Sequence, residues 1–153
     1  MSAKRRVGYA AGAYDLFHIG HLNLLRHAKS ECDYLIAGVV ADEMLVMNKN
    51  MSPMVPLSER LEIVSHIDFV DEAYAETVPE KMDVWRALRF DVFFKGDDWR
   101  GTEKGLRLER EFAEVGVEVV YFPYTMSTSS TVLRRAVAAL DAATPRLSST
   151  GGE

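Results

Sequence analysis

The chain has 153 residues, of which 48% are hydrophobic and 27% are charged, and its formal net charge is −5. This length supports one domain with a sizeable core, and the composition is typical of a soluble globular protein. The acidic balance argues against a nucleic-acid partner, because such binders present a basic surface to phosphate. No apolar run approaches the ~20 residues that a membrane-spanning helix needs, so we expect no membrane partner either.

The ends of the chain and its cysteine usage bear on where the protein works. Residues 1–6 are basic but lack the apolar stretch of a signal peptide. Cys32 is the single cysteine and cannot form a disulfide within the chain, which fits a reducing compartment. These features predict a cytoplasmic protein.

Short apolar runs alternate with helical patterns along the chain. The run 35–40 has no polar alternation, which is typical of a parallel strand buried on both faces. Strands that alternate with helices imply right-handed βαβ units, with a ligand at the carboxyl ends of the strands, beside the first one. The predicted strands are Val7–Ala11, Tyr34–Val40, Glu72–Ala75, Val92–Lys95 and Val117–Phe122.

The remaining segments are predicted as helices, one loop and a tail. Apolar residues at helical spacing predict helices over 20–32, 57–64, 80–88, 103–115 and around 133–140. Residues 47–56, with three methionines and two prolines, predict an irregular loop over the site. Residues 1–141 are predicted to form the α/β domain, with a five-stranded parallel sheet flanked by helices. Residues 142–153 are small and polar and predict a disordered tail.

The segment 12–21, GAYDLFHIGH, lies where the first predicted strand meets the first helix. His18 and His21 stand there three residues apart, with Gly20 between them. Backbone N–H groups and the helix dipole attract phosphate at a helix N-terminus. An imidazole can add a hydrogen bond to a phosphoryl oxygen, and the glycine allows close approach of the backbone. A lone histidine here is usually a cap or a surface residue, but this pair favours phosphate chemistry.

Three motifs in order resemble the HxGH nucleotidyltransferase superfamily. They are the segment 12–21, the stretch KGDDW at 95–99 after a predicted strand, and SST at 129–131 at the start of the last helix. The set is similar to the glycerol-3-phosphate cytidylyltransferase branch, from about Val7 to about Ala138. The resemblance implies a Rossmann-like fold and transfer of a nucleotidyl group.

The resemblance implies roles for the first motif. His18 and His21 would contact the α-phosphate and stabilise the pentacoordinate transition state, by positioning and charge rather than by covalent catalysis. Asp15 is either a turn or N-cap residue or, as we favour, a residue that aligns the acceptor phosphate or a metal-bound water. Nucleotide binding is assigned to Gly12, Ala13, Tyr14 and Gly20.

Two further elements receive roles from the resemblance. Lys49 is either a solvated lysine or, as we favour, a catalytic residue that reaches the triphosphate. In KGDDW the carboxylates could form an Asx-turn. The match to the superfamily instead favours recognition of base and ribose by Gly96, Asp97 and Asp98. A carboxylate can accept a hydrogen bond from the cytosine amino group. Trp99 is a wall of that pocket or an acceptor contact.

The stretch 127–131 of serines and threonines opens the last helix. Such residues are ordinary caps, but five exceed what capping needs, and hydroxyls with free N–H groups suit the β- and γ-phosphates. The superfamily has Arg-Thr where this chain has Tyr124-Thr125, which removes a bidentate phosphate donor. Asp68 also stands where a basic residue is common. Arg134 or Arg135 could supply the charge. Predicted nucleotide-binding residues here are Thr125, Ser129, Ser130 and Thr131.

The sequence therefore predicts a cytidylyltransferase that joins CTP to a small phosphorylated alcohol, with glycerol 3-phosphate as the first choice. Mg²⁺ would come with the triphosphate, since no cluster of His, Asp and Glu suggests a metal cage in the protein. The superfamily implies a homodimer. The alternatives are adenylyl transfer to a flavin or sugar phosphate, and a nucleotide-binding module without turnover.

Overall fold

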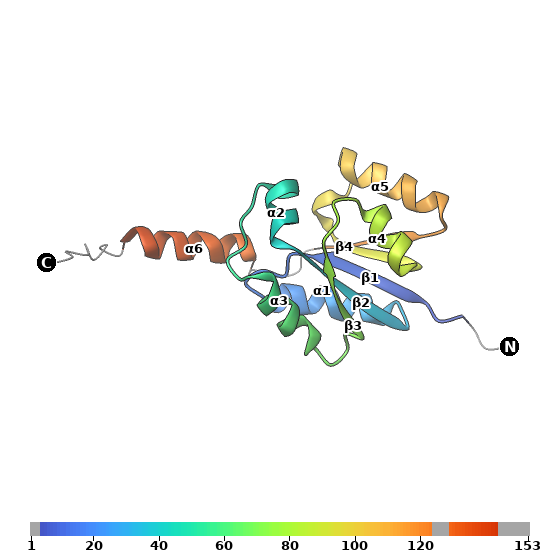
Figure 1. The fold of residues 1–153 in the computed structure, drawn as a ribbon, viewed down its shortest axis with the longest axis horizontal. Helices are drawn as coiled ribbons and strands as arrows, with labels where there is room; N and C mark the ends of the chain where they lie inside the picture. The colour runs from blue at the N-terminus through green and yellow to red at the C-terminus, as the bar shows by residue number, and fades with distance from the viewer. Residues whose placement is uncertain (1–3, 124–128, 144–153) are drawn as a thin grey trace, which may run out of the picture.

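Five parallel strands form the sheet, in the order β3-β2-β1-β4-β5 (Figure 1). The computed structural model describes residues 4–123 and 129–143. The α/β fold with a five-stranded parallel sheet is confirmed, and each strand boundary lies within one residue of its predicted position. The strands are β1 Val7–Gly12, β2 Tyr34–Val40, β3 Glu72–Glu76, β4 Val92–Gly96 and β5 Glu118–Phe122.

Helices cover both faces of the sheet (Figure 1). Helices α1 (Ile19–Ser30) and α3 (Leu57–Ser65) pack on one face, and α4 (Lys81–Leu88) and α5 (Glu103–Glu114) pack on the other. Successive residues of β1 point to opposite faces. Ala10 joins the core under α1 and α3, whereas Tyr9 joins the core under α4 and α5. Burial on both sides explains why the strands are apolar without alternation.

The chain changes direction across the sheet beside β1. From β1 it moves outward through β2 to β3, then crosses to β4 on the other side of β1 and continues to β5. The connections that leave β1 and β4 therefore diverge, and a crevice opens at the carboxyl ends of these two strands. The loop 13–18 and the 3₁₀ turn η1 (Asp97–Trp99) border this crevice.

The structure differs from the predictions at one unpredicted helix and at the end of the last helix. Helix α2 (Asp42–Lys49) was not predicted, so the loop expected over 47–56 is wrong for its first three residues. Acidic residues in the first turn and the helix-forming Met and Leu side chains stabilise α2. Helix α6 (Ser130–Ala143) continues two residues beyond the predicted domain end at 141. The rest of the predicted tail, 144–153, lies outside the described residues.

Helix α6 extends away from the body of the domain (Figure 1), and none of its residues is buried. Within the described part of the chain, no helix combines the length and apolar character needed to cross a bilayer.

Candidate active site

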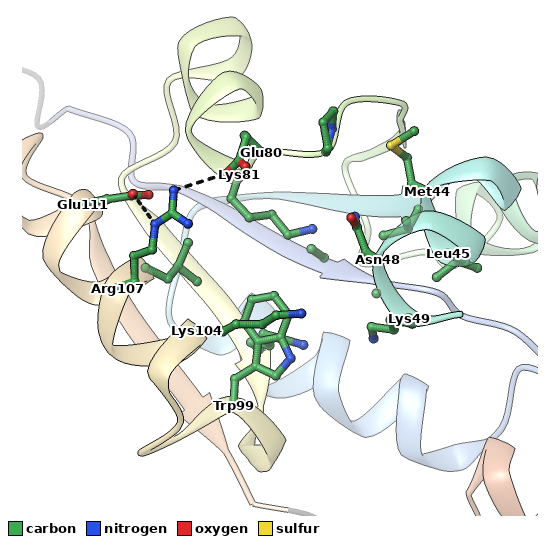
Figure 2. A pocket seen from close by; sticks show the side chains of 16 residues that line it. Met44, Leu45, Asn48, Lys49, Glu80, Lys81, Trp99, Lys104, Arg107 and Glu111 are labelled. Carbon is green, nitrogen blue, oxygen red and sulfur yellow. Dashed lines mark hydrogen bonds and ion pairs between the residues drawn. The ribbon is translucent and has the colours of Figure 1, made fainter. Parts of the chain in front are cut away.

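Two cavities meet at the carboxyl ends of β1 and β4. The large cavity has a volume of about 660 Å³ and lies toward α1 and α6. The small cavity has a volume of about 230 Å³ and lies between α2, α4 and α5 (Figure 2). Both are lined by Ala11, Gly12, Lys49 and Lys95. A molecule in one cavity can therefore reach a molecule in the other.

His18 and His21 line the large cavity at the N-terminus of α1. His18 is the N-cap of the helix, and its Nδ1 accepts a hydrogen bond from Gly20 N at 3.0 Å. His21 Nδ1 accepts from His18 N at 3.2 Å. Because both Nδ1 atoms are acceptors, the neutral rings carry their protons on Nε2. The capping and functional interpretations of His18 are thus compatible, since the cap fixes the tautomer that can donate to phosphate.

The surroundings keep both imidazoles neutral. Burial lowers the pKa of His18. Burial, and then repulsion from His18, lower the pKa of His21 to about 3. The two ring centroids lie 4.0 Å apart, so two N–H donors stand side by side without a full positive charge on either ring. Neutral donors bind phosphoryl oxygens without needing a protonation step.

Asp15 lies beneath the large cavity and is not one of its lining residues. Its side chain is fully buried, and its oxygens accept hydrogen bonds from Met54 N at 2.8 Å and Val55 N at 2.9 Å. Arg134 on α6 forms an ion pair with the same carboxylate at 2.9 Å. Burial alone would raise the pKa of Asp15, but these three partners outweigh it and lower the pKa below its usual value. Asp15 thus joins the loop 13–18, the 54–55 segment and α6.

The backbone around Asp15 is strained. Tyr14 and Leu16 both have left-handed φ angles, of 53° and 51°, which cost free energy for residues with a side chain. The buried Tyr14 hydroxyl donates to Ala10 O at 2.8 Å and fixes the first of these turns. Such strain persists only where surrounding contacts enforce it, and it commonly marks functional loops.

Arg60, a buried residue of α3, holds the same loop from below. Its guanidinium donates to Ala13 O at 2.6 Å, Val40 O at 2.8 Å and Val55 O at 2.8 Å, and it pairs with Asp42. Our sequence analysis did not identify this residue. The signal was present, because Arg60 lies on the otherwise apolar stripe of Leu57, Leu61 and Val64.

The N-terminus of α6 forms another wall of the large cavity. Ser129, Ser130 and Thr131 all line it. The Ser129 hydroxyl accepts from Val132 N at 3.1 Å, so this residue caps the helix. The Ser130 hydroxyl donates to Asp15 O at 2.7 Å. Arg134 also lines this cavity one turn later, so α6 places a cation close to its own N-terminus. Tyr124 and Thr125 lie outside the described residues.

The KGDDW segment divides between the two cavities. Gly96 and Asp98 line the large cavity, whereas Trp99 lines the small one. Asp97 lines neither and pairs with Arg100 at 2.9 Å. Asp97 therefore does not line a cavity with the other predicted nucleotide-binding residues.

Lysines stand at the junction of the cavities. Lys49 is the last residue of α2, not a loop residue as predicted. Burial of the Lys95 side chain, and then repulsion by Lys49, lower the pKa of Lys95 to about 8. The pKa of Lys49 is also lowered, first by partial loss of water and then by repulsion from Lys81, Lys104 and Arg134. The attraction of Asp98 opposes this shift but does not cancel it. Neighbouring cations thus repel one another at this junction.

The structure brings most predicted residues to one place. The large cavity is lined by Gly12, Ala13, Tyr14, His18, Gly20, His21, Lys49, Gly96, Asp98, Ser129, Ser130 and Thr131. We predicted no role for Lys81 and Lys104 in the small cavity, because each is a lone lysine in its own segment, and none for Lys95, although it begins the KGDDW motif. Among the described residues, no group of three or more His, Cys, Asp or Glu side chains could hold a metal ion.

Comparison with known proteins places this geometry in a family. The family profile described as Cytidylyltransferase-like matches residues 9–150. Glycerol-3-phosphate cytidylyltransferase of Bacillus spizizenii is 34% identical over 130 residues, which cover 84% of this chain and 95% of that protein. FAD synthase of Thermococcus onnurineus is 33% identical over 117 residues, which cover 75% of this chain and 77% of that protein.

A solved structure supports the fold. The lipopolysaccharide core biosynthesis protein of Thermoplasma volcanium superimposes with a TM-score of 0.68 and 22% identity, over 82% of this chain and all of that one. The sheet order, the paired histidines at the start of α1 and the extent of the sequence match agree with one another. The chain belongs to the cytidylyltransferase-like family and is a nucleotidyltransferase.

Proposed function

We propose that the protein transfers CMP from CTP to a small phosphorylated alcohol, with glycerol 3-phosphate as the first candidate. The observation that carries the proposal is the pair of neutral Nε2–H donors of His18 and His21 facing the large cavity. The similarity to a glycerol-3-phosphate cytidylyltransferase over nearly the whole chain supports the choice of nucleotide and acceptor.

In the proposed reaction a phosphate oxygen of the acceptor attacks the α-phosphorus of CTP. The new P–O bond forms as the bond to the α–β bridging oxygen breaks, and pyrophosphate leaves. His18 and His21 stabilise the charge that builds on the α-phosphoryl oxygens. The N-terminus of α6 and Arg134 bind the β- and γ-phosphates.

Mg²⁺ is proposed as the cofactor. Asp98 is the one carboxylate among the described residues that line the large cavity, so the phosphates would supply most of the ligands. The ion neutralises charge on the triphosphate when it is bound. Asp15 acts as a positioning residue in this scheme, because its oxygens are engaged by Met54, Val55 and Arg134.

We also propose a homodimer in a reducing compartment such as the cytoplasm. Val132 and Val137 on α6 have exposed apolar side chains, which would lie in the subunit contact. Sedimentation analysis would test the dimer, and a monomer at micromolar concentration would contradict it.

Adenylyl transfer to a flavin is the second candidate, because an FAD synthase is a relative at similar identity. The small cavity, at about 230 Å³, is below the ~300–1,000 Å³ of pockets for drug-sized ligands and favours a small acceptor over a flavin. Pyrophosphate release with each of the four nucleoside triphosphates and a panel of acceptors tests the proposal. Release with CTP and glycerol 3-phosphate is expected, and release with only ATP would overturn it.

A further inference from the structure

The small cavity is unusually cationic for a chain with net charge −5. Five cationic side chains line it, namely Lys49, Lys81, Lys95, Lys104 and Arg107, against two acidic ones, Glu80 and Glu111. Both acids are engaged by Arg107, at 4.0 Å and 2.9 Å (Figure 2). Lys81 is paired with the buried carboxylate of Glu76, so Lys49, Lys95 and Lys104 set the charge of the space that remains.

The lysines occupy two different positions. Lys49 and Lys95 line both cavities. Lys81 and Lys104 line only the small cavity. If the acceptor phosphate reacts where the two cavities meet, the rest of the acceptor extends toward Lys81 and Lys104.

Contacts beneath the cavity fix these side chains in place. Lys81 is bound by the buried carboxylate of Glu76, which also accepts from the Tyr9 hydroxyl at 2.6 Å. Tyr9 reaches Glu76 by passing directly over Gly38, where an added Cβ would lie 1.9 Å from the tyrosine oxygen. Figure 2 shows the Lys81 side chain pointing across the cavity toward Asn48.

Trp99 forms the opposite wall of the small cavity, and the ammonium groups of two lysines lie over its ring. Lys95 Nζ lies 4.1 Å from the centre of the Trp99 ring, and Lys104 Nζ lies 5.9 Å from it. Lys95 is 8% exposed, and its ammonium is 3.9 Å from Asp98, beyond hydrogen-bond length. The first turn of α5 packs on Trp99 so closely that a Cβ at Gly105 would lie 2.0 Å from Trp99 O. The wall is therefore rigid.

We infer that the small cavity selects a phosphorylated acceptor with a second anionic group, a carboxylate or a second phosphate, over the neutral diol end of glycerol 3-phosphate, and that this group binds Lys81 and Lys104 at the far end of the cavity. The inference rests on the proposed function, since it takes the reacting phosphate to lie at the junction by Lys49 and Lys95. A neutral diol end would leave the charge of Lys104 without a ligand partner. An anionic end would relieve the repulsion among the lysines and form charge-assisted hydrogen bonds.

Two acceptors that differ at one carbon test this inference. Glycerol 3-phosphate and 3-phosphoglycerate share the same three-carbon phosphate skeleton, with a terminal alcohol in the first and a carboxylate in the second. Calorimetry with the whole chain should give a Kd roughly tenfold lower for 3-phosphoglycerate, the size expected of one charge-assisted hydrogen bond. Equal or weaker binding of 3-phosphoglycerate, or no binding of either compound, would overturn the inference.

Lysine variants test which side chain causes the preference for 3-phosphoglycerate. Lys104→Gln should remove most of the preference. Lys104 lies on the exposed side of α5, so its variant is expected to fold. Lys4→Gln, at an 88% exposed side chain far from the cavity, is the matched control. A preference that survives Lys104→Gln would contradict the inference.

Binding and turnover separate this inference from the proposed function. If 3-phosphoglycerate binds with the expected preference but neither compound receives CMP, the anionic subsite stands and the proposed function fails. If both compounds are turned over with equal KM, the proposed function stands and the second anionic group is refuted.

Discussion

The two cavities at the edge of the sheet present different groups to an anion. The large cavity presents imidazole N–H groups, hydroxyls and two helix N-termini, whereas the small cavity presents lysines around a tryptophan. Directional donors suit a phosphoryl group whose geometry changes during the reaction. Ammonium groups, which attract an anion from any direction, suit a ligand that only needs to be held. We therefore assign chemistry to the large cavity and acceptor selection to the small one.

The largest expected effect is a loss of turnover when either histidine of the large cavity is replaced. His18→Ala and His21→Ala should each lower kcat by ~10²–10³-fold, because each removes one donor to the transition state. His18→Asn should restore the helix cap without restoring kcat, which separates stability from catalysis. The exposed His66 supplies the control variant His66→Ala. Turnover within about threefold of wild type for either alanine variant, with unchanged circular dichroism, would refute the assignment.

The serine-rich start of α6 offers the next largest effect. Ser129→Ala combined with Thr131→Ala should raise the Kd of CTP roughly five- to a hundredfold, from two lost hydrogen bonds. The Kd of CMP should change much less, because CMP has no β- or γ-phosphate. Calorimetry with both ligands measures this. An equal loss for CTP and CMP, together with a lower Tm, would mean that these residues only cap the helix.

Because the buried histidines are neutral in the folded protein, acidification should lower the free energy of unfolding. The folded pKa of His21 is about 3, below its usual value near 6.5. As the pH falls below about 6.5, the unfolded chain gains a proton that the folded chain does not, so the free energy of unfolding falls by up to ~1.4 kcal/mol per pH unit. Urea denaturation between about pH 7 and pH 5 measures this slope.

The matched variants identify the group responsible for that slope. His21→Gln should flatten it, whereas His66→Gln should leave it unchanged, because no buried imidazole is removed. The neutral-donor account would be contradicted if the His21→Gln protein showed the same slope as wild type.

The smallest expected effect concerns Arg134. Arg134→Gln should raise the KM for CTP roughly two- to fivefold, since a partly exposed cation contributes about 0.5–1 kcal/mol. The exposed neighbour Arg135 provides the control Arg135→Gln. Identical KM values for the two variants would show that Arg134 serves Asp15 alone.

The sequence predicted the large cavity better than the small one, for a physical reason. His18, Gly20 and His21 act together because they share one helix start, and their spacing is visible along the chain. The sheet is likewise predictable, because strands buried on both faces must be apolar throughout.

The small cavity depends on contacts between distant segments. Lys81 begins α4, Lys95 is the second-last residue of β4 and Lys104 lies on α5, so only the fold brings them together. The motif around Asp15 could not reveal that Met54, Val55 and Arg134 contact its carboxylate. Asp97 and Asp98 are neighbours in one 3₁₀ turn, yet only Asp98 lines the large cavity.

The division of work between the cavities is tested most directly by crossing variants with ligands. Calorimetry would measure CTP and 3-phosphoglycerate binding to two proteins, Lys104→Gln and the combined Ser129→Ala and Thr131→Ala variant. We predict that Lys104→Gln weakens only 3-phosphoglycerate and that the serine–threonine variant weakens only CTP. If each variant weakened both ligands to the same extent, the two cavities would not hold separate substrates, and the account would be wrong.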